Sequence, residues 1–181
     1  MAAAPQISAK AMGMIDFIHE RMNMIVPHLD DIRNLMQSNN PKWRQIEEKI
    51  AATELEILDA SQEVNELKKL ANKEGFPGDM RASIGEQAGQ LSDIFRSIAS
   101  IKGHASYAGR GDAAARAAMQ TELDALLLQA RGTQILVASF HQQVGQHGGS
   151  RKRKRSKRSL RLKRSKRSKR TKRKQRTHRK I

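Results

Sequence analysis

The chain has 181 residues, with 35 Lys and Arg against 18 Asp and Glu, which gives a formal net charge of +17. Of the 31 residues in 151–181, 20 are Lys or Arg and none is acidic, so residues 1–150 are slightly acidic. The absence of cysteine excludes disulfide scaffolds, thiol catalysis and thiolate zinc sites. No apolar run reaches the roughly 20 residues of a membrane-spanning helix, and the first 17 residues lack a signal-peptide pattern. We therefore expect an intracellular protein that is neither secreted nor transmembrane.

The first predicted helix covers about residues 7–37. Its apolar residues are spaced alternately by three and four positions, which is typical of a helix with one coiled-coil-like seam. These residues are Ile15, Ile18, Met22, Ile25, Leu29, Ile32 and Met36. Pro27 lies within the pattern and should kink or divide the helix, because proline removes a backbone donor and crowds the preceding turn.

The second predicted helix covers residues 41–73, with Asn40 as its N-cap and Pro41 at its first position. Its seam has the same spacing and consists of Trp43, Ile46, Ile50, Thr53, Ile57, Ala60, Val64, Leu67 and Ala71. Two glycines and a proline in residues 74–78 should end this helix, and Asp79 is positioned to cap the next one.

The third predicted helix covers residues 79–102 and carries the weakest pattern, because Gly85 and Gly89 interrupt it. Its seam is Ile84, Leu91, Ile94, Ile98 and Ile101. We interpret residues 103–111 as a loop, after which Asp112 caps a fourth helix over 112–145. The fourth seam is Met119, Leu123, Leu126, Ala130, Thr133, Val137, Phe140 and Val144.

The predicted fold class is all-α, because no segment shows the alternating pattern of a strand. Short connections place consecutive long helices antiparallel, so residues 1–145 should form an antiparallel four-helix bundle. The alternative is a set of coiled-coil hairpins that complete their core only by pairing with other chains. Apolar residues outside the seams fit either a wide core or an oligomer contact, which we predict at Leu55 and Leu58. The other residues of this kind are Met14, Phe17, Met24, Leu35, Leu128 and Ile135.

A glycine-rich hinge at 146–150 is predicted to connect the bundle to a basic tail at 151–181. The tail should be extended or disordered, because like charges repel along a helix and few apolar residues are present to bury. Such a segment suits the phosphate backbone of DNA or RNA, and it contains no aromatic residue that could stack on bases. The predicted nucleic-acid-binding residues are Arg151, Lys152, Arg153, Lys154, Arg155, Lys157, Arg158, Arg161, Lys163, Arg164, Lys166, Arg167, Lys169, Arg170, Lys172, Arg173, Lys174, Arg176, Arg179 and Lys180.

Other interpretations of the basic tail remain open at this point. Lys-Arg directly precedes Ser159, Ser165, Ser168 and Thr171, which makes these four residues candidate phosphorylation sites. A basic run can also serve only as a nuclear or nucleolar address. Docking on anionic lipid is not expected, because only Leu160, Leu162 and Ile181 could insert into a membrane. The tail can equally bind an acidic protein surface, such as the one predicted on the second helix. That surface consists of Glu47, Glu48, Glu54, Glu56, Asp59, Glu63 and Glu66.

The sequence contains no arrangement that favours catalysis. The six histidines form no metal-binding motif, and the pair Asp16 and His19, three residues apart on one helix, occurs only once. Residues 103–111 are rich in glycine but lack the Lys-Ser/Thr of a phosphate-binding loop. We therefore expect no enzyme activity, no cofactor and no metal.

Together these features predict a non-enzymatic structural protein. Its helical body should make protein–protein contacts within an oligomer or larger assembly, and its basic tail should bind nucleic acid without sequence specificity. A virion capsid or core component is the favoured setting, by analogy with proteins of similar layout. The alternatives are a cellular DNA-compacting or ribonucleoprotein factor, and a helical adaptor whose tail is only a localisation signal. A cellular protein of this kind would be nuclear or nucleolar.

Overall fold

The structure is a computed structural model that describes residues 7–148 and contains no strand within that range. Its helices are α1 (Ala9–Gln37), α2 (Trp43–Lys73), α3 (Gly78–Ala108) and α4 (Ala113–Gly148). The predicted all-α class with four long helices is confirmed. The predicted extended tail at 151–181 lies outside the described residues.

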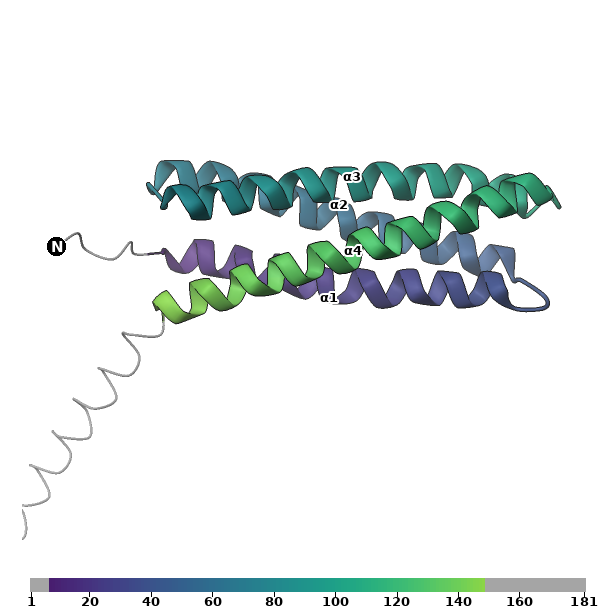
Figure 1. The fold of residues 1–181 in the computed structure, drawn as a ribbon, viewed down its shortest axis with the longest axis horizontal. Coiled ribbons are helices and arrows are strands. Elements are labelled where there is room, and N and C mark those ends of the chain that lie inside the picture. The colour runs from purple at the N-terminus through teal and green to yellow at the C-terminus, as the bar shows by residue number, and fades with distance from the viewer. Residues whose placement is uncertain (1–6, 149–181) are drawn as a thin grey trace, which may run out of the picture. The chain divides into compact units, whose positions relative to one another are not determined.

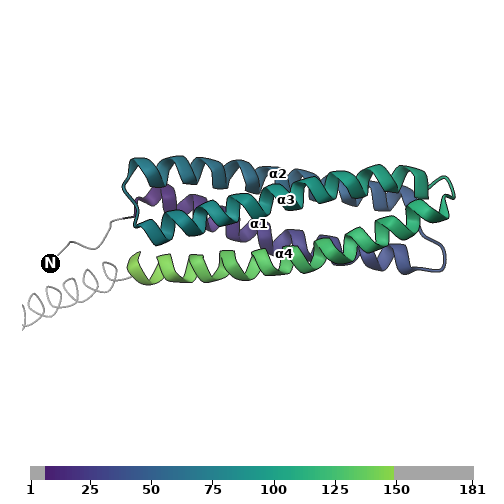
Figure 2. The same cartoon turned by 45° about the horizontal axis from the view of Figure 1, so that its top comes forward.

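The helices form an up-down-up-down bundle that closes within one chain. The α1–α2 and α3–α4 connections lie at one end of the bundle, and the α2–α3 connection lies at the other (Figures 1 and 2). Thr133 Oγ1 on α4 donates a hydrogen bond of 2.9 Å to Gln90 Oε1 on α3, and Gln134 Nε2 donates one of 2.9 Å to Asn23 Oδ1 on α1. Because α4 contacts both α3 and α1, the chain completes its core without a second copy.

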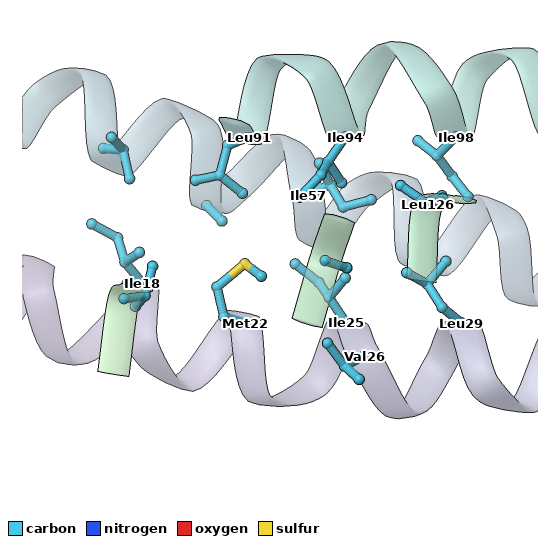
Figure 3. Packing of buried hydrophobic residues seen from close by; sticks show 14 of the residues in the cluster. Ile18, Met22, Ile25, Val26, Leu29, Ile57, Leu91, Ile94, Ile98 and Leu126 are labelled. Carbon is cyan, nitrogen blue, oxygen red and sulfur yellow. The ribbon is translucent and has the colours of Figure 1, made fainter. Parts of the chain in front are cut away.

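The predicted seams make up most of the core. Every residue assigned to a seam is buried except Trp43, which is half-buried and packs against the core. Side chains of α1 such as Met22 point across the centre toward side chains of α3 such as Leu91 (Figure 3). Full burial of a large aliphatic side chain contributes about 1.5–3 kcal/mol, so the four seams supply the main driving force for folding.

The three buried polar residues of the seams and their surroundings, Thr53, Gln87 and Thr133, have hydrogen-bond partners within the bundle. Thr53 Oγ1 donates to the carbonyl oxygen of Lys49 over 2.8 Å, and Thr133 Oγ1 lies 3.0 Å from the carbonyl oxygen of Gln129. Gln87 Nε2 lies 3.4 Å from Ser83 Oγ. A buried polar group that has a hydrogen-bond partner costs little, so these residues are accommodated in an apolar core.

The helix starts agree only in part with the predicted caps. The predicted cap of α4 is confirmed, because Asp112 Oδ1 accepts hydrogen bonds from the amides of Ala114 and Ala115 at 2.9 and 3.0 Å. The predicted Asn40 cap is wrong, because α2 begins at Trp43 and residues 38–42 are all needed to carry the chain from α1 to α2. Asp79 lies in the first turn of α3 and does not cap it.

The predicted loop at 103–111 is wrong over most of its length, because α3 continues to Ala108. Ala105 and Ala108 are buried and extend the α3 seam by one more turn. Their burial and the high helix propensity of alanine offset the roughly 1 kcal/mol that Gly103 costs inside a helix. The chain reverses only at residues 109–111, where Gly111 adopts a φ of 96° that favours glycine.

Two other predicted interruptions are absent from the described helices. Pro27 lies inside a continuous α1, so it does not divide the helix. The helix α4 extends to Gly148, so the first three residues of the predicted hinge at 146–150 are helical. A glycine lowers helix stability by only about 1 kcal/mol, and it therefore does not by itself end a helix. The last two residues of that hinge lie outside the described residues.

The apolar residues outside the seams fall into two groups. Met14 is buried, while Phe17, Leu35 and Leu58 are half-buried at the edge of the core. The other four are exposed by 36% for Met24, 62% for Leu55, 77% for Leu128 and 71% for Ile135. A wide core thus explains the first group and leaves the second group on the surface.

We expect Ile57→Ala to lower the free energy of unfolding by about 2–5 kcal/mol, because Ile57 is fully buried and its truncation leaves a cavity. Leu55→Ala, two residues away on the exposed side of the same helix, should change it by less than about 0.5 kcal/mol. Urea denaturation followed by circular dichroism measures both. Equal effects of the two substitutions would contradict the assignment of the α2 core face.

Candidate nucleic-acid interface

The predicted interface belongs to a different unit of the chain from the helical core. The chain divides into two units, residues 1–144 and residues 145–181. The 20 predicted nucleic-acid-binding residues and the four predicted phosphorylation sites all lie between 151 and 181, outside the described residues. The described residues therefore inform on this interface only indirectly. Their surface charges show whether another part of the chain could attract a polyanion.

Ion pairs between α1 and α2 hold several of the body's charges in place. Arg21 lies between two carboxylates of α2, 3.4 Å from Glu56 and 3.5 Å from Asp59. Nearer the α1–α2 connection, Lys49 Nζ donates a hydrogen bond of 2.7 Å to Asp31 Oδ2. Each pair is partly solvated, so its contribution to stability is small, but together the pairs fix which charges face outward.

The contact between α1 and α4 uses charges in the same way. Arg131 of α4 donates from one guanidinium nitrogen to both carboxylate oxygens of Asp30, at 2.9 Å each. Arg33 of α1 lies 3.0 Å from Asp124 of α4. Both arginines are thus neutralised by carboxylates of the neighbouring helix.

More than half of the body's cations are engaged with its own acids. The 20 Lys and Arg of residues 151–181 leave 15 for the rest of the chain, and eight of these form ion pairs. The predicted acidic surface of α2 is matched in the same way, since five of its seven carboxylates pair with cations. These five are Glu48, Glu54, Glu56, Asp59 and Glu66. Uncompensated positive charge therefore belongs mainly to the segment 151–181.

Two of these pairs lower the pKa of a carboxyl group. The hydrogen bond from Lys49, followed by its charge, holds the pKa of Asp31 below its ordinary value of 3.8. Lys69 has the same effect on the pKa of Glu66, whose ordinary value is 4.5. Because both folded-state pKa values are depressed, the pairs stabilise the fold above the ordinary values, and this contribution is lost as pH falls through the lowered values.

The structure brings a third polar residue to the Asp16 and His19 pair. His141 Nε2 of α4 lies 2.8 Å from Asp16 Oδ1, and the rings of His19 and His141 stack with their centroids 4.5 Å apart. No local sequence pattern predicts this contact, because His141 lies 125 positions away from Asp16 on another helix. Among residues 7–148, no group of three or more His, Asp or Glu side chains could hold a metal ion. The cluster acts as a polar contact between α1 and α4.

Two arginines near the α3–α4 connection lie over aromatic rings instead of beside acids. Arg116 is 5.1 Å from the ring centre of Trp43, and Arg110 is 6.0 Å from that of Tyr107. Sequence reasoning missed the first contact, which joins the start of α4 to the start of α2. Such cation–π contacts contribute about 0.5–1 kcal/mol at exposed sites, and here they help to fix the end of the bundle.

A hollow of about 330 Å³ lies between α3 and α4. Its lining residues are Arg96, Ser97, Ser100, Glu122 and Ala125. Arg96 pairs with Asp93 on its own helix. Glu122 Oε1 lies 3.3 Å from His104 Nε2, which forms an ion pair only when His104 is protonated, and Glu122 Oε2 is buried without a hydrogen-bond partner. The surface that lines the hollow is mainly apolar, which does not suit a polyanion.

Within the described part of the chain, no helix combines the length and the apolar character needed to cross a membrane. The chain matches no protein-family model, no curated protein and no solved structure.

We expect Lys49→Met to raise the pKa of Asp31 toward 3.8, because the substitution removes both the hydrogen bond and the charge that lower it. A carboxyl-carbon titration by nuclear magnetic resonance measures this shift. Lys42→Met is the matched control, because it removes a lysine from the same end of α2 and should leave the pKa of Asp31 in place. An unchanged Asp31 pKa in Lys49→Met would show that the pair does not form in solution.

Proposed function

We propose that this chain is a non-enzymatic structural protein that binds nucleic acid without sequence specificity. The segment 151–181 supplies the affinity for phosphate, and the helical bundle supplies protein–protein contacts for assembly. The observation that carries the proposal is the segregation of charge. Twenty cations and no acids lie within 31 residues, beside a body that is slightly acidic.

The charge of the segment suits a polyanion in amount as well as in sign. Duplex DNA carries one charge per roughly 1.7 Å of helix axis, so 20 cations can neutralise about 20 phosphates, or about one turn of duplex. Arginine and lysine bind phosphate oxygens singly or as a fork, and neither mode needs a preset fold. Contacts of this kind position a protein on nucleic acid but do not read its sequence.

The arrangement of the body supports the same division of roles. Its ion pairs engage eight of its 15 cations, and its small net negative charge disfavours contact with a polyanion. Its long helical faces offer surface for protein contacts. We favour a virion capsid or core component as the setting, because such proteins combine an assembling body with a basic arm, and this argument is one of analogy.

The salt dependence of binding tests the proposal in the full-length chain. For contacts with Z phosphates, the slope of log affinity against log salt concentration is about −0.9Z for duplex DNA. We expect replacement by glutamine of the ten cations in 151–164 to halve this slope, and replacement of the ten in 166–180 to halve it equally. Fluorescence anisotropy with duplexes of unrelated sequence and with single-stranded RNA measures it.

The control is a body variant that carries Lys42→Gln, Lys68→Gln and Lys73→Gln, which should leave the slope unchanged. Binding that survives replacement of all 20 cations would contradict the assignment to the segment. A loss confined to one half would indicate a localised recognition element. Weak binding by the full-length chain at physiological salt would instead favour the adaptor with an address signal.

A further inference from the structure

The outer face of α4 carries a second seam in addition to the one in the core. Leu128 and Ile135 are the two most exposed large apolar side chains of the described residues, at 77% and 71%. They are seven residues apart and so lie on the same side of the helix. The full stripe alternates by four and three positions and contains no charged residue. It consists of Ala118, Thr121, Ala125, Leu128, Gly132, Ile135, Ser139 and Gln142, all exposed except the half-buried Ala118.

The exposed leucine on α2 has a different setting. Around Leu55, the exposed positions one and two turns away include the charged residues Glu48 and Asp59. A single apolar side chain among charges is ordinary for a protein surface. Beside the α4 stripe, by contrast, Asp124 and Arg131 form ion pairs with Arg33 and Asp30 of α1. The stripe is therefore the longer uncharged surface, with its bordering charges already neutralised.

The stripe also has a regular pattern of side-chain size. One row holds its larger members, Thr121, Leu128, Ile135 and Gln142, and the other holds its small members, Ala118, Ala125, Gly132 and Ser139. Reversal of the helix direction about residue 130 exchanges the two rows, so that each larger residue takes the position of a small one. If a second copy of α4 lies antiparallel, with a twofold axis at residue 130, every layer pairs one larger with one small side chain. Leu128 then meets Gly132 of the other copy, and Ile135 meets Ala125.

A parallel arrangement does not produce the same fit. It would place Leu128 against Leu128 and Gly132 against Gly132, so that crowded layers would alternate with empty ones. Well-packed interfaces place large side chains opposite small ones. A surface that fits itself about a twofold axis is the requirement for a symmetric dimer. The size pattern therefore identifies a second copy of this chain as the occupant of the stripe.

We propose that two copies of the protein associate through antiparallel packing of α4 against α4, centred on residue 130. The stripe is about 36 Å long and about 10 Å wide, which gives a total buried area of about 720 Å². Stable interfaces bury about 1,200–2,000 Å², so the dimer is weak alone and forms as concentration rises. Binding of two copies to one nucleic acid raises their effective concentration and strengthens the contact. This last step rests on the proposed function, whereas the dimer itself does not.

Sedimentation equilibrium of the full-length chain without nucleic acid tests the dimer separately from nucleic-acid binding. High salt is used because each copy carries a net charge of +17, and a Debye length of about 3 Å at 1 M salt screens the repulsion. We expect Leu128→Glu to weaken self-association at least about tenfold. Leu55→Glu places the same charge at the exposed α2 leucine for which the sequence predicts an oligomer contact, and the α4 arrangement requires that it leave self-association unchanged.

A second variant separates loss of the contact from loss of the fold. A Cβ atom added at Gly132 would meet no atom within 4 Å beyond its chain neighbours and the adjacent backbone of its own helix, so the monomer has space for Gly132→Leu. Removal of a glycine from a helix should raise the melting temperature. In the dimer, the new side chain would collide with Leu128 of the other copy, so self-association should fall. A more stable protein with weaker self-association is the expected result.

The relative orientation of the two α4 helices is tested by disulfide cross-linking. The chain contains no native cysteine, so only the introduced cysteines can react. A mixture of Thr121→Cys and Ser139→Cys chains should form disulfide-linked heterodimers, whereas Thr121→Cys alone should not link efficiently. Efficient linking of Thr121→Cys with itself would overturn the antiparallel arrangement. A monomer at all concentrations, unchanged association in Gly132→Leu, or dissociation by Leu55→Glu instead of Leu128→Glu would overturn the α4 contact itself.

Discussion

Each of the four long helices carries a continuous apolar seam that must be removed from water, and this requirement governs the rest of the structure. A single helix cannot bury its own seam, and a pair of helices leaves part of the larger residues exposed. Four helices joined by short connections bury the seams together, with Met22 and Ile25 of α1 facing the seam of α3 (Figure 3). The antiparallel order follows from the short connections, and the surface ion pairs follow from the order.

The distribution of charge matches this arrangement. In the body, cations such as Arg21 and Arg131 pair with carboxylates of adjacent helices, so these charges stabilise the contacts between helices. The segment 151–181 contains no acidic residue that could pair with its cations in this way. Specific packing and the proposed affinity for a polyanion therefore belong to separate regions of the chain. Changes to one region, such as phosphorylation of the basic segment, could then alter affinity without disturbing the core.

The helix α4 differs from the others because it presents apolar residues on two opposite sides. One side faces the core through residues such as Leu126, and the other presents Leu128 and Ile135 to solvent in the single chain. The internal closure of the bundle means that this outer side is not needed for folding. It is therefore available for association between copies, and an assembly could form from folded units without exchange of helices.

The sequence by itself determined the helical class, the seams and the segregation of charge, because these depend on the spacing and type of nearby residues. It predicted the end of α3 wrongly, because burial of Ala105 and Ala108 outweighs the cost of Gly103 only when a neighbouring helix is present. Only the tertiary structure decided that the bundle closes within one chain, that His141 meets Asp16, and that Leu58 is half-buried while Leu128 is exposed. These outcomes depend on contacts between residues far apart in the chain, which local spacing does not encode.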